Sequence, residues 1–235
     1  MSDRNGAVAP AGLPAWWEPL LTRARAARIE DFTTLRPPAG GGRPSAVLVL
    51  LGEQRPGAPD LLVLQRAATM RNHAGQPAFP GGAADPGDRD PADTALREAR
   101  EEVGLDPASA TVLAMLPKLL IPVSRFVVTP VLAWWHAPHP VHACEPAEVA
   151  HVARLPVAEL VDPAHRIRVR HPRSGYVSPA FQVRGMLVWG FTAGVISTLL
   201  DLAGWSRPWE PSRVVDLPIN DPVPAPDGLP DEVVS

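Results

Sequence analysis

The sequence predicts an α/β domain, α+β in its content, in which mixed strands pack in a layer with helices on either side. Two short apolar runs, at residues 45–51 and 60–65, have the length and composition of buried strands. Segments 91–103 and 188–202 have the length of helices, and the first is bounded by helix-capping residues. Apolar strands and helices of this kind bury their apolar faces against each other in a shared core.

Composition narrows the classes of protein further. With 235 residues, of which 46% are hydrophobic, the chain can bury a full core as one domain with extensions. A net charge of -3 argues against nucleic-acid binding through a general basic surface, and no apolar stretch reaches the ~20 residues that cross a bilayer. The single cysteine, Cys144, has no partner for a disulfide, which fits a reducing cytoplasm. We therefore expect a soluble, cytoplasmic protein that binds neither nucleic acid nor membrane.

The chain divides into three parts. Residues 1–36 form an N-terminal extension, in which apolar residues recur at helical spacing between positions 15 and 29 and predict an amphipathic helix. Residues 37–206 form the main domain. Residues 207–235 are rich in Pro and Asp and show little periodicity, so we predict a flexible tail there.

The first half of the main domain reads as a hairpin, a loop and a helix. The glycines and prolines between residues 52 and 59 separate the two apolar runs, which predicts a hairpin. A loop at 72–78 precedes a glycine turn. Asp90 is placed to cap a helix that has Pro91 at its first position, and Gly104 is placed to end it.

The second half of the main domain is predicted to alternate short strands with loops. Residues 111–116 and 125–135 read as strands, and Pro130 indicates that the second lies at a sheet edge or contains a bulge. The elements expected after the loop at 136–146 are a strand at 148–155, a helical turn at 157–160, a strand at 166–170 and the apolar helix at 188–202.

The helix at 91–103 carries three glutamates near its end. Glu98, Glu101 and Glu102 are spaced so that their carboxylates share one face, opposite the apolar face. Like charges at Glu98 and Glu102 cost roughly 0.2–0.5 kcal/mol, and anions in the last turn oppose the helix dipole by ~0.3–1 kcal/mol. One interpretation is a solvated acidic surface. The other is a site for a hard divalent cation such as Mg²⁺, whose preferred ligands are oxygens.

The residues around these glutamates favour the cation site. The run Arg97-Glu98-x-x-Glu101-Glu102-x-Gly104-Leu105 resembles the Nudix box, whose pattern is G-x5-E-x7-R-E-U-x-E-E-x-G-U with U an apolar residue. The pattern expects Glu at 89 and Gly at 83, where this chain has Arg89 and Ala83. The loop before the helix therefore holds one extra residue, and Asp88 or Asp85 stands in for the missing glutamate.

A second motif, which precedes the box, makes the resemblance more specific. Arg66-Ala67-x-x-x-Arg71-x-x-x-Gly75-x-x-x-Phe79-Pro80-Gly81-Gly82 is similar to the signature of coenzyme A pyrophosphatases, a subfamily that tends to have the longer box loop. Segments 124–130, 148–149 and 188–194 also resemble this subfamily. The resemblance covers roughly residues 44–204 and implies the α/β/α sandwich of the Nudix fold, with a mixed sheet between helices.

The resemblance implies a metal site on the glutamate helix. Glu98 and Glu102 are the expected ligands of Mg²⁺, with Mn²⁺ as an alternative, and Glu101 is a third ligand or orients a bound water. Arg97 matches the box arginine, which orients a glutamate. A pair between Arg97 and Glu101 at i, i+4 is the geometry that this role requires.

The resemblance also implies the general base and the substrate contacts. Glu148 is the expected base because it matches the Glu-Val pair of the subfamily, and Glu145 is the alternative. Arg66 and Arg71 are the expected phosphate contacts, since guanidinium groups suit a pyrophosphate or the 3′-phosphate of coenzyme A. The residues that would let the backbone approach the pyrophosphate are Gly81 and Gly82.

The function that the resemblance implies is Mg²⁺-dependent hydrolysis of coenzyme A or its derivatives to 3′,5′-ADP and 4′-phosphopantetheine. One alternative is a Nudix hydrolase that acts on another nucleoside diphosphate derivative, such as ADP-ribose or a dinucleotide. A second alternative is a Nudix-fold module that binds a nucleotide without catalysis. In each case the partner is a small molecule, and a homodimer is left open.

Overall fold

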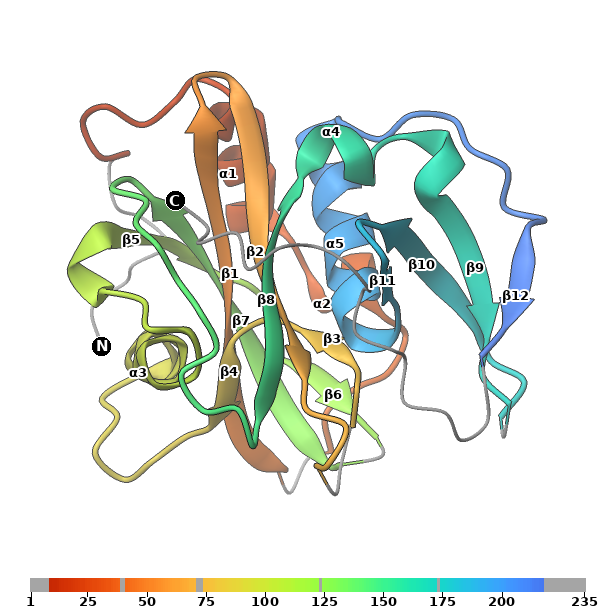
Figure 1. Cartoon of the computed structure of the whole chain (residues 1–235), viewed down its shortest axis with the longest axis horizontal. Helices are drawn as coiled ribbons and strands as arrows, with labels where there is room; N and C mark the ends of the chain where they lie inside the picture. The colour runs from red at the N-terminus through yellow and green to blue at the C-terminus, as the bar shows by residue number, and fades with distance from the viewer. Residues whose placement is uncertain (1–8, 39–40, 71–73, 123, 173, 218–235) are drawn as a thin grey trace.

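The computed structural model describes residues 9–38, 41–70, 74–122, 124–172 and 174–217 (Figure 1). A mixed sheet forms the centre of the molecule, with strands in the order β3-β2-β1-β7-β5. The long strands β1 and β7 pair in parallel, whereas β2 pairs antiparallel with β1. The strands of this sheet are β1 (Arg43–Arg55), β2 (Ala58–Arg66), β3 (Pro77–Ala78), β4 (Gly81–Ala83), β5 (Ala110–Met115), β6 (Leu119–Ile121), β7 (Phe126–Trp135) and β8 (Val149–Pro156).

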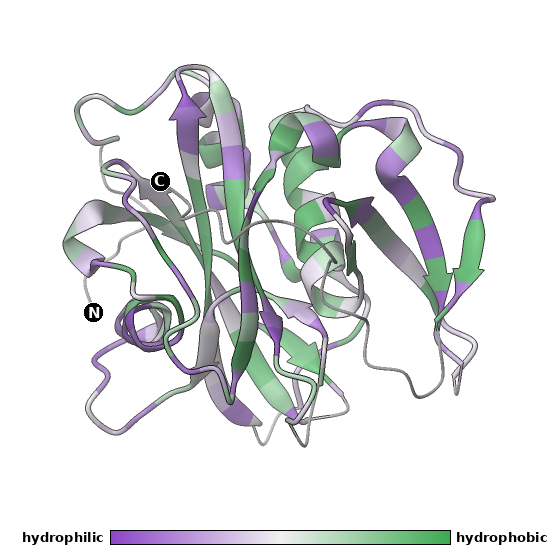
Figure 2. Ribbon diagram, viewed as in Figure 1, coloured by the Kyte–Doolittle hydropathy of each residue, from purple (hydrophilic) through white to green (hydrophobic). Residues whose placement is uncertain are grey.

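Helices cover both faces of this sheet, which confirms the predicted fold class. In Figure 1, α3 lies on one side of the sheet and α1 and α5 lie on the other. The helices are α1 (Trp17–Ala26), α2 (Ile29–Phe32), α3 (Pro91–Val103), α4 (Val157–Leu160) and α5 (Gly190–Ala203), with 3-10 turns at Pro107–Ser109 and Pro163–His165. Figure 2 shows α5 as mostly hydrophobic and α3 as mixed, in line with the deeper burial of α5.

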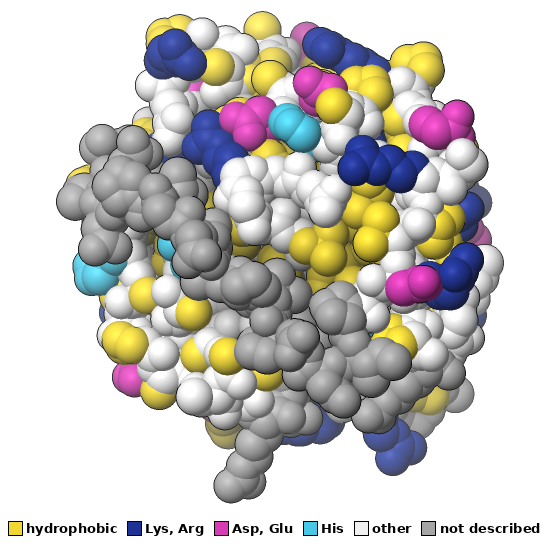
Figure 3. Space-filling view, turned by 45° about the vertical axis from the view of Figure 1, so that its right-hand side comes forward, with side chains coloured by type: hydrophobic (Ala, Val, Ile, Leu, Met, Phe, Trp, Pro, Cys, Tyr) yellow, Lys and Arg dark blue, Asp and Glu magenta, His cyan; other side chains and the backbone are white. Residues whose placement is uncertain are grey.

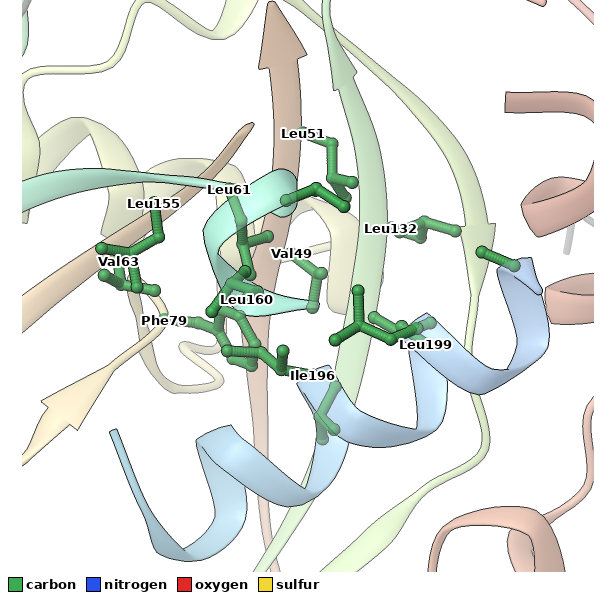
Figure 4. Packing of buried hydrophobic residues seen from close by; sticks show 14 of the residues in the cluster. Val49, Leu51, Leu61, Val63, Phe79, Leu132, Leu155, Leu160, Ile196 and Leu199 are labelled. Atoms are coloured by element: carbon green, nitrogen blue, oxygen red, sulfur yellow. The ribbon is translucent and has the colours of Figure 1, made fainter. Parts of the chain in front are cut away.

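The alternation of side chains along the buried strands divides the core in two. Leu48 and Leu50 pack in the cluster that contains the apolar face of α3. Val49 and Leu51 point the other way, into the cluster that contains Ile196 of α5, as Figure 4 shows. The run of apolar residues at 46–51 therefore packs against core clusters on both faces of the sheet.

The helix expected between residues 15 and 29 is present but shorter. It spans α1 and ends at Ala27, whose backbone is extended, and α2 follows as a single turn. The apolar side chains of α1 are buried in the core cluster that includes α5. The hairpin between the two apolar runs is confirmed, with strands that extend to Arg55 and Ala58.

Pro130 lies in an internal strand, so the expectation of an edge position is wrong. Strand β7 pairs with β1 along one side and with β5 and β6 along the other. On the second side, β6 pairs with β7 up to Val128 and β5 pairs with it from Val131 onward, so Pro130 lies between the two. There the Leu116 amide donates to the Pro130 carbonyl. The missing amide hydrogen of Pro130 therefore falls where the neighbouring strand is interrupted.

A second sheet packs beyond α5 and was not predicted from the sequence. Its order is β11-β10-β9-β12, with β9 at Arg166–Arg170, as expected, and with β10 (Val177–Val183), β11 (Met186–Val188) and β12 (Val214–Asp216). Strand β12 pairs in parallel with β9, and Leu217 after it is buried. The prediction of a flexible tail at 207–235 is therefore wrong for 214–217, while 218–235 lie outside the described residues.

On the face drawn in Figure 3, acidic, basic and hydrophobic side chains are interspersed, so this face carries no continuous basic surface among the described residues. No helix in the described ranges is both long and apolar enough to cross a membrane.

Candidate active site

Helix α3 forms where its caps predict it. The Asp90 side chain accepts hydrogen bonds from the amides of Ala92 (2.8 Å) and Asp93 (3.0 Å). Gly104 ends the helix in the left-handed region, with φ of 70°. The buried alanines of α3 pack on the sheet, which turns the glutamates of the last two turns toward strand β4.

Two glycines let these glutamates reach the strand. A Cβ atom on Gly82 would lie 2.5 Å from the carboxylate carbon of Glu98. A Cβ atom on Gly81 would lie 2.4 Å from the carbonyl oxygen of Ala46 on β1. The missing side chain at Gly81 lets β4 pair closely with β1, and the missing side chain at Gly82 leaves room for the Glu98 carboxylate.

Glu102 is the most buried acid of the site, with 4% of its surface exposed. Its carboxylate accepts a hydrogen bond of 2.9 Å from the Gly81 amide, and Arg66 Nη1 lies 3.9 Å away. Burial raises the pKa of Glu102 to about 7, against the smaller opposing effects of the Gly81 amide and Arg66. The pKa of Glu98 is also raised, mainly by burial. At both carboxylates, therefore, the cost of burying a negative charge outweighs the stabilisation by nearby donors and cations.

Arg97 joins the other acids of the site. Its guanidinium group lies 3.1 Å from Glu101, at i+4, and 3.0 Å from Glu98. It also donates to the Ala83 carbonyl oxygen at 3.1 Å, which ties α3 to the end of β4. The structure thus contains the expected Arg97–Glu101 pair. With 52% of its side chain exposed, Glu101 is held at the rim of the site.

Of the two loop acids expected to stand in for the missing box glutamate, Asp88 is the one that helix α3 holds. Its carboxylate accepts hydrogen bonds from Arg97 Nε (3.1 Å) and Nη2 (3.2 Å), and from the Thr94 hydroxyl at 2.8 Å. These bonds, first of all those from Arg97, lower the pKa of Asp88 to about 2. Asp85 is 64% exposed and lies 3.8 Å from Arg97, so of the two candidates Asp88 makes the closer contact. Thr94, a contact that sequence reasoning missed, is a buried polar residue in the first turn of α3.

The three glutamates do not converge as they stand. Among the described residues, no three side chains of the His, Cys, Asp and Glu type form a group that could hold a metal ion. The reason is that Arg97 draws Glu98 and Glu101 toward itself, while Glu102 turns to Gly81. The chemistry of the Glu98 and Glu102 pair nonetheless fits a hard cation, because both are oxygen donors whose charge is disfavoured by burial.

The remaining predicted residues lie at the end of β2 and its neighbour β8. The Arg66 Nε atom is buried and has no hydrogen-bond partner among the described residues. Glu148 precedes β8, and its carbonyl accepts from the Ala67 amide at 2.8 Å. The charge of Glu148 is one of the causes that raise the pKa of Glu102, and that of Glu145 is not among them. Arg71 lies outside the described residues.

Comparisons with known proteins find related sequences and a related fold. The NUDIX domain family matches residues 42–174. The chain is 42% identical over 181 residues to an uncharacterized Nudix hydrolase, NudL, of Cronobacter sakazakii, a match that covers 73% of this chain and 90% of that protein. It is 40% identical over 182 residues to NudL of Citrobacter koseri, with the same coverage. The solved structure of a Nudix hydrolase from M. smegmatis, RenU, superimposes with a TM-score of 0.50 at 19% identity and covers 72% of this chain and 92% of that one.

The two glycines of β4 give contrasting predictions. Gly81→Ala should destabilise the protein by about 3 kcal/mol, because its Cβ meets backbone atoms of β1 that cannot move aside. Gly82→Ala should cost less than about 1 kcal/mol, because its Cβ meets only the mobile end of the Glu98 side chain. Urea unfolding of both variants measures this difference. Equal destabilisation would contradict the packing described for β4.

The raised pKa of Glu102 predicts a pH-dependent stability in chelator. The folded state holds this proton up to about pH 7, whereas the unfolded chain releases it near the ordinary value of 4.5. The contribution of Glu102 is therefore fully present below the unfolded pKa and is lost as the pH rises to about 7. Relative to Glu102→Gln, the wild type should lose on the order of 3 kcal/mol over this window. If the unfolding free energies of the wild type and of Glu102→Gln change in parallel with pH, burial does not raise the pKa of Glu102.

The contacts of Asp88 predict a structural difference between two neighbouring aspartates. Asp88→Ala should lower the free energy of unfolding by about 2 kcal/mol at neutral pH, since it removes charge-assisted hydrogen bonds from Arg97. Asp85→Ala is the matched control and should change it by less than about 0.5 kcal/mol. The difference should fade as the pH falls toward the lowered pKa of about 2. A larger effect at Asp85 would reverse the assignment.

Proposed function

The chain belongs to the NUDIX domain family, and from that premise we propose that it hydrolyses the pyrophosphate bond of coenzyme A or its derivatives. The products would be 3′,5′-ADP and 4′-phosphopantetheine. The observation that carries the proposal is the pair of buried carboxylates, Glu98 and Glu102, beside the guanidinium group of Arg66. Carboxylates that can bind a cation and a guanidinium group that can bind a phosphate therefore lie side by side.

Glu98 and Glu102 would hold a divalent cation, Mg²⁺ or Mn²⁺. When bound, the cation supplies charge neutralisation on the phosphate oxygens and acidifies a water molecule. Two carboxylates are sufficient for Mg²⁺, which keeps waters and substrate phosphate as its other ligands. Glu101, held by Arg97 at the rim, orients a bound water in this proposal.

The other residues divide the remaining tasks. Arg66 binds a phosphate oxygen through its free Nε and its Nη atoms, which supplies the partner that the buried Nε lacks. Glu148 accepts the proton of the attacking water, because its charge is close enough to Glu102 to affect the pKa of that residue. Gly81 and Gly82 hold the backbone of β4 close to the reacting phosphates.

Coenzyme A as the substrate rests on the motif from Arg66 to Gly82 that precedes the glutamate helix. Both ends of this motif lie near the carboxylates, since Arg66 Nη1 is 3.9 Å from Glu102 and the Gly81 amide donates to Glu102, which supports a shared role in the proposed site. The Gly75 carbonyl accepts from the Gln65 side chain at 3.3 Å, which holds the described part of the intervening loop against β2. A soluble, cytoplasmic enzyme acting on a small molecule is part of the same proposal.

The test is the identity of the products. Purified protein with Mg²⁺ should convert coenzyme A to the two fragments named above, as mass spectrometry or phosphorus NMR would show. Glu102→Gln should lower kcat by about 100-fold or more, while Glu18→Gln, an exposed acid of α1, should leave it unchanged. Turnover that survives Glu102→Gln would refute the site. Equal or faster turnover of ADP-ribose would refute coenzyme A as the substrate.

A nucleotide-binding module without catalysis is the competing function. The presence of all three box glutamates disfavours it. Nucleotide binding without any metal binding in a titration would favour it.

A further inference from the structure

A cavity of about 710 Å³ lies at the start of β1, apart from the candidate active site. Residues from the segment after α2, from the turn into β1, and from β6 and the loop that follows it line the cavity, which is open to solvent. Three arginines line it, Arg36, Arg43 and Arg125, and the described residues of its lining include no acid. Its volume is that of a small-molecule site.

Two of these guanidinium groups have no carboxylate partner in the described chain. Arg43 stacks on Phe126, with its guanidinium carbon 4.6 Å from the ring centroid. No ion pair joins Arg43 or Arg125 to a described residue, whereas Arg36 pairs with the exposed Glu30. Like charges that share one cavity repel each other unless an anion lies among them. The positive charge of the lining therefore favours an anionic ligand.

The backbone that carries Arg125 is strained and closely held. Arg125 has φ of 57°, a conformation that residues with long side chains rarely adopt. Its carbonyl accepts from the Arg43 amide at 3.1 Å, and a Cβ atom on Gly42 would lie 2.7 Å from the same oxygen. Strain of this kind is concentrated at functional sites. The neighbouring Ser124 hydroxyl is buried without a partner, so it is available to a ligand oxygen.

Strand β1 relates this cavity to the carboxylates. Val47 pairs with Gly81, and Arg43 begins the same strand ~13 Å away at the usual rise per residue. By alternation, Arg43 and Val47 lie on the α5 face of the sheet, whereas Glu98 and Glu102 come from the α3 face. The cavity is therefore a separate site.

We infer that this cavity binds the phosphate group of an organic phosphate, with Arg43, Arg125 and the Ser124 hydroxyl as ligands. Guanidinium groups and a hydroxyl are donors that match phosphate oxygens. Two sources share this chemistry. One is a second phosphate of the substrate, such as the 3′-phosphate of coenzyme A, and this source rests on the proposed function. The other is a separate phosphorylated molecule, which does not.

The first experiment measures binding directly. Calorimetric titration in chelator would use two probes, inorganic phosphate and adenosine 3′,5′-bisphosphate. The double variant Arg43→Gln/Arg125→Asn should bind both probes about tenfold or more weakly than the wild type. Asn tolerates the left-handed backbone, so this variant should fold. Arg55→Gln, at the far end of β1, removes one positive charge away from the cavity and is the control, which should bind like the wild type.

The second experiment distinguishes the two sources. If the substrate's own phosphate occupies the cavity, the double variant should raise the KM for coenzyme A about tenfold relative to the KM for dephospho-coenzyme A, which lacks the 3′-phosphate. If calorimetric binding falls while this KM ratio stays constant, the occupant is a separate organic phosphate. Either result supports the cavity as a phosphate site.

Equal affinity of the wild type and the double variant for both probes would overturn the inference. Absence of coenzyme A turnover in every protein would count against the proposed function alone, because the calorimetric result decides the cavity independently.

Discussion

The hydrogen bond from the Gly81 amide to the Glu102 carboxylate, 2.9 Å long, is the contact on which the candidate active site depends. It fixes the last turns of α3 against β4, where Gly81 has no side chain to clash with β1 and Gly82 has none to clash with Glu98. The same contact confines Glu102 to a place where its charge is poorly solvated. A buried carboxylate of this kind is stable when a proton or a cation accompanies it.

Arg97 divides the acids of the site into two groups. Asp88, Glu98 and Glu101 all contact its guanidinium group, and hydrogen bonds from it lower the pKa of Asp88 to about 2. Glu102 has no such contact with Arg97, and burial raises its pKa to about 7. Neighbouring carboxylates with pKa values so far apart occupy different environments, and such separation is how sites assign distinct roles to chemically similar groups. Asp88 fixes the loop against the helix, whereas Glu98, whose pKa burial raises despite its contact with Arg97, shares with Glu102 an environment that favours a cation.

Sequence patterns predicted the features of this site that depend on neighbouring residues of one helix. The caps at Asp90 and Gly104 and the Arg97–Glu101 pair follow from spacing along one helix. The second sheet was missed because β12 is a three-residue strand that pairs with the distant strand β9, and because β11, also of three residues, pairs with β10 through a tight hairpin that was not recognised. The choice of Asp88 over Asp85 depends on loop geometry, which a one-residue insertion leaves open. The arginines of the cavity at the start of β1 come from three separate segments, so no motif contains them.

The central proposal is that Glu98 and Glu102 together bind a divalent cation. Titration with Mn²⁺, followed by electron paramagnetic resonance of the free ion, tests it most directly. The wild type and the exposed-site control Glu18→Gln should bind one ion with the same affinity. Glu98→Gln and Glu102→Gln should each weaken binding about tenfold or more. Unchanged Mn²⁺ affinity in both site variants would contradict the account.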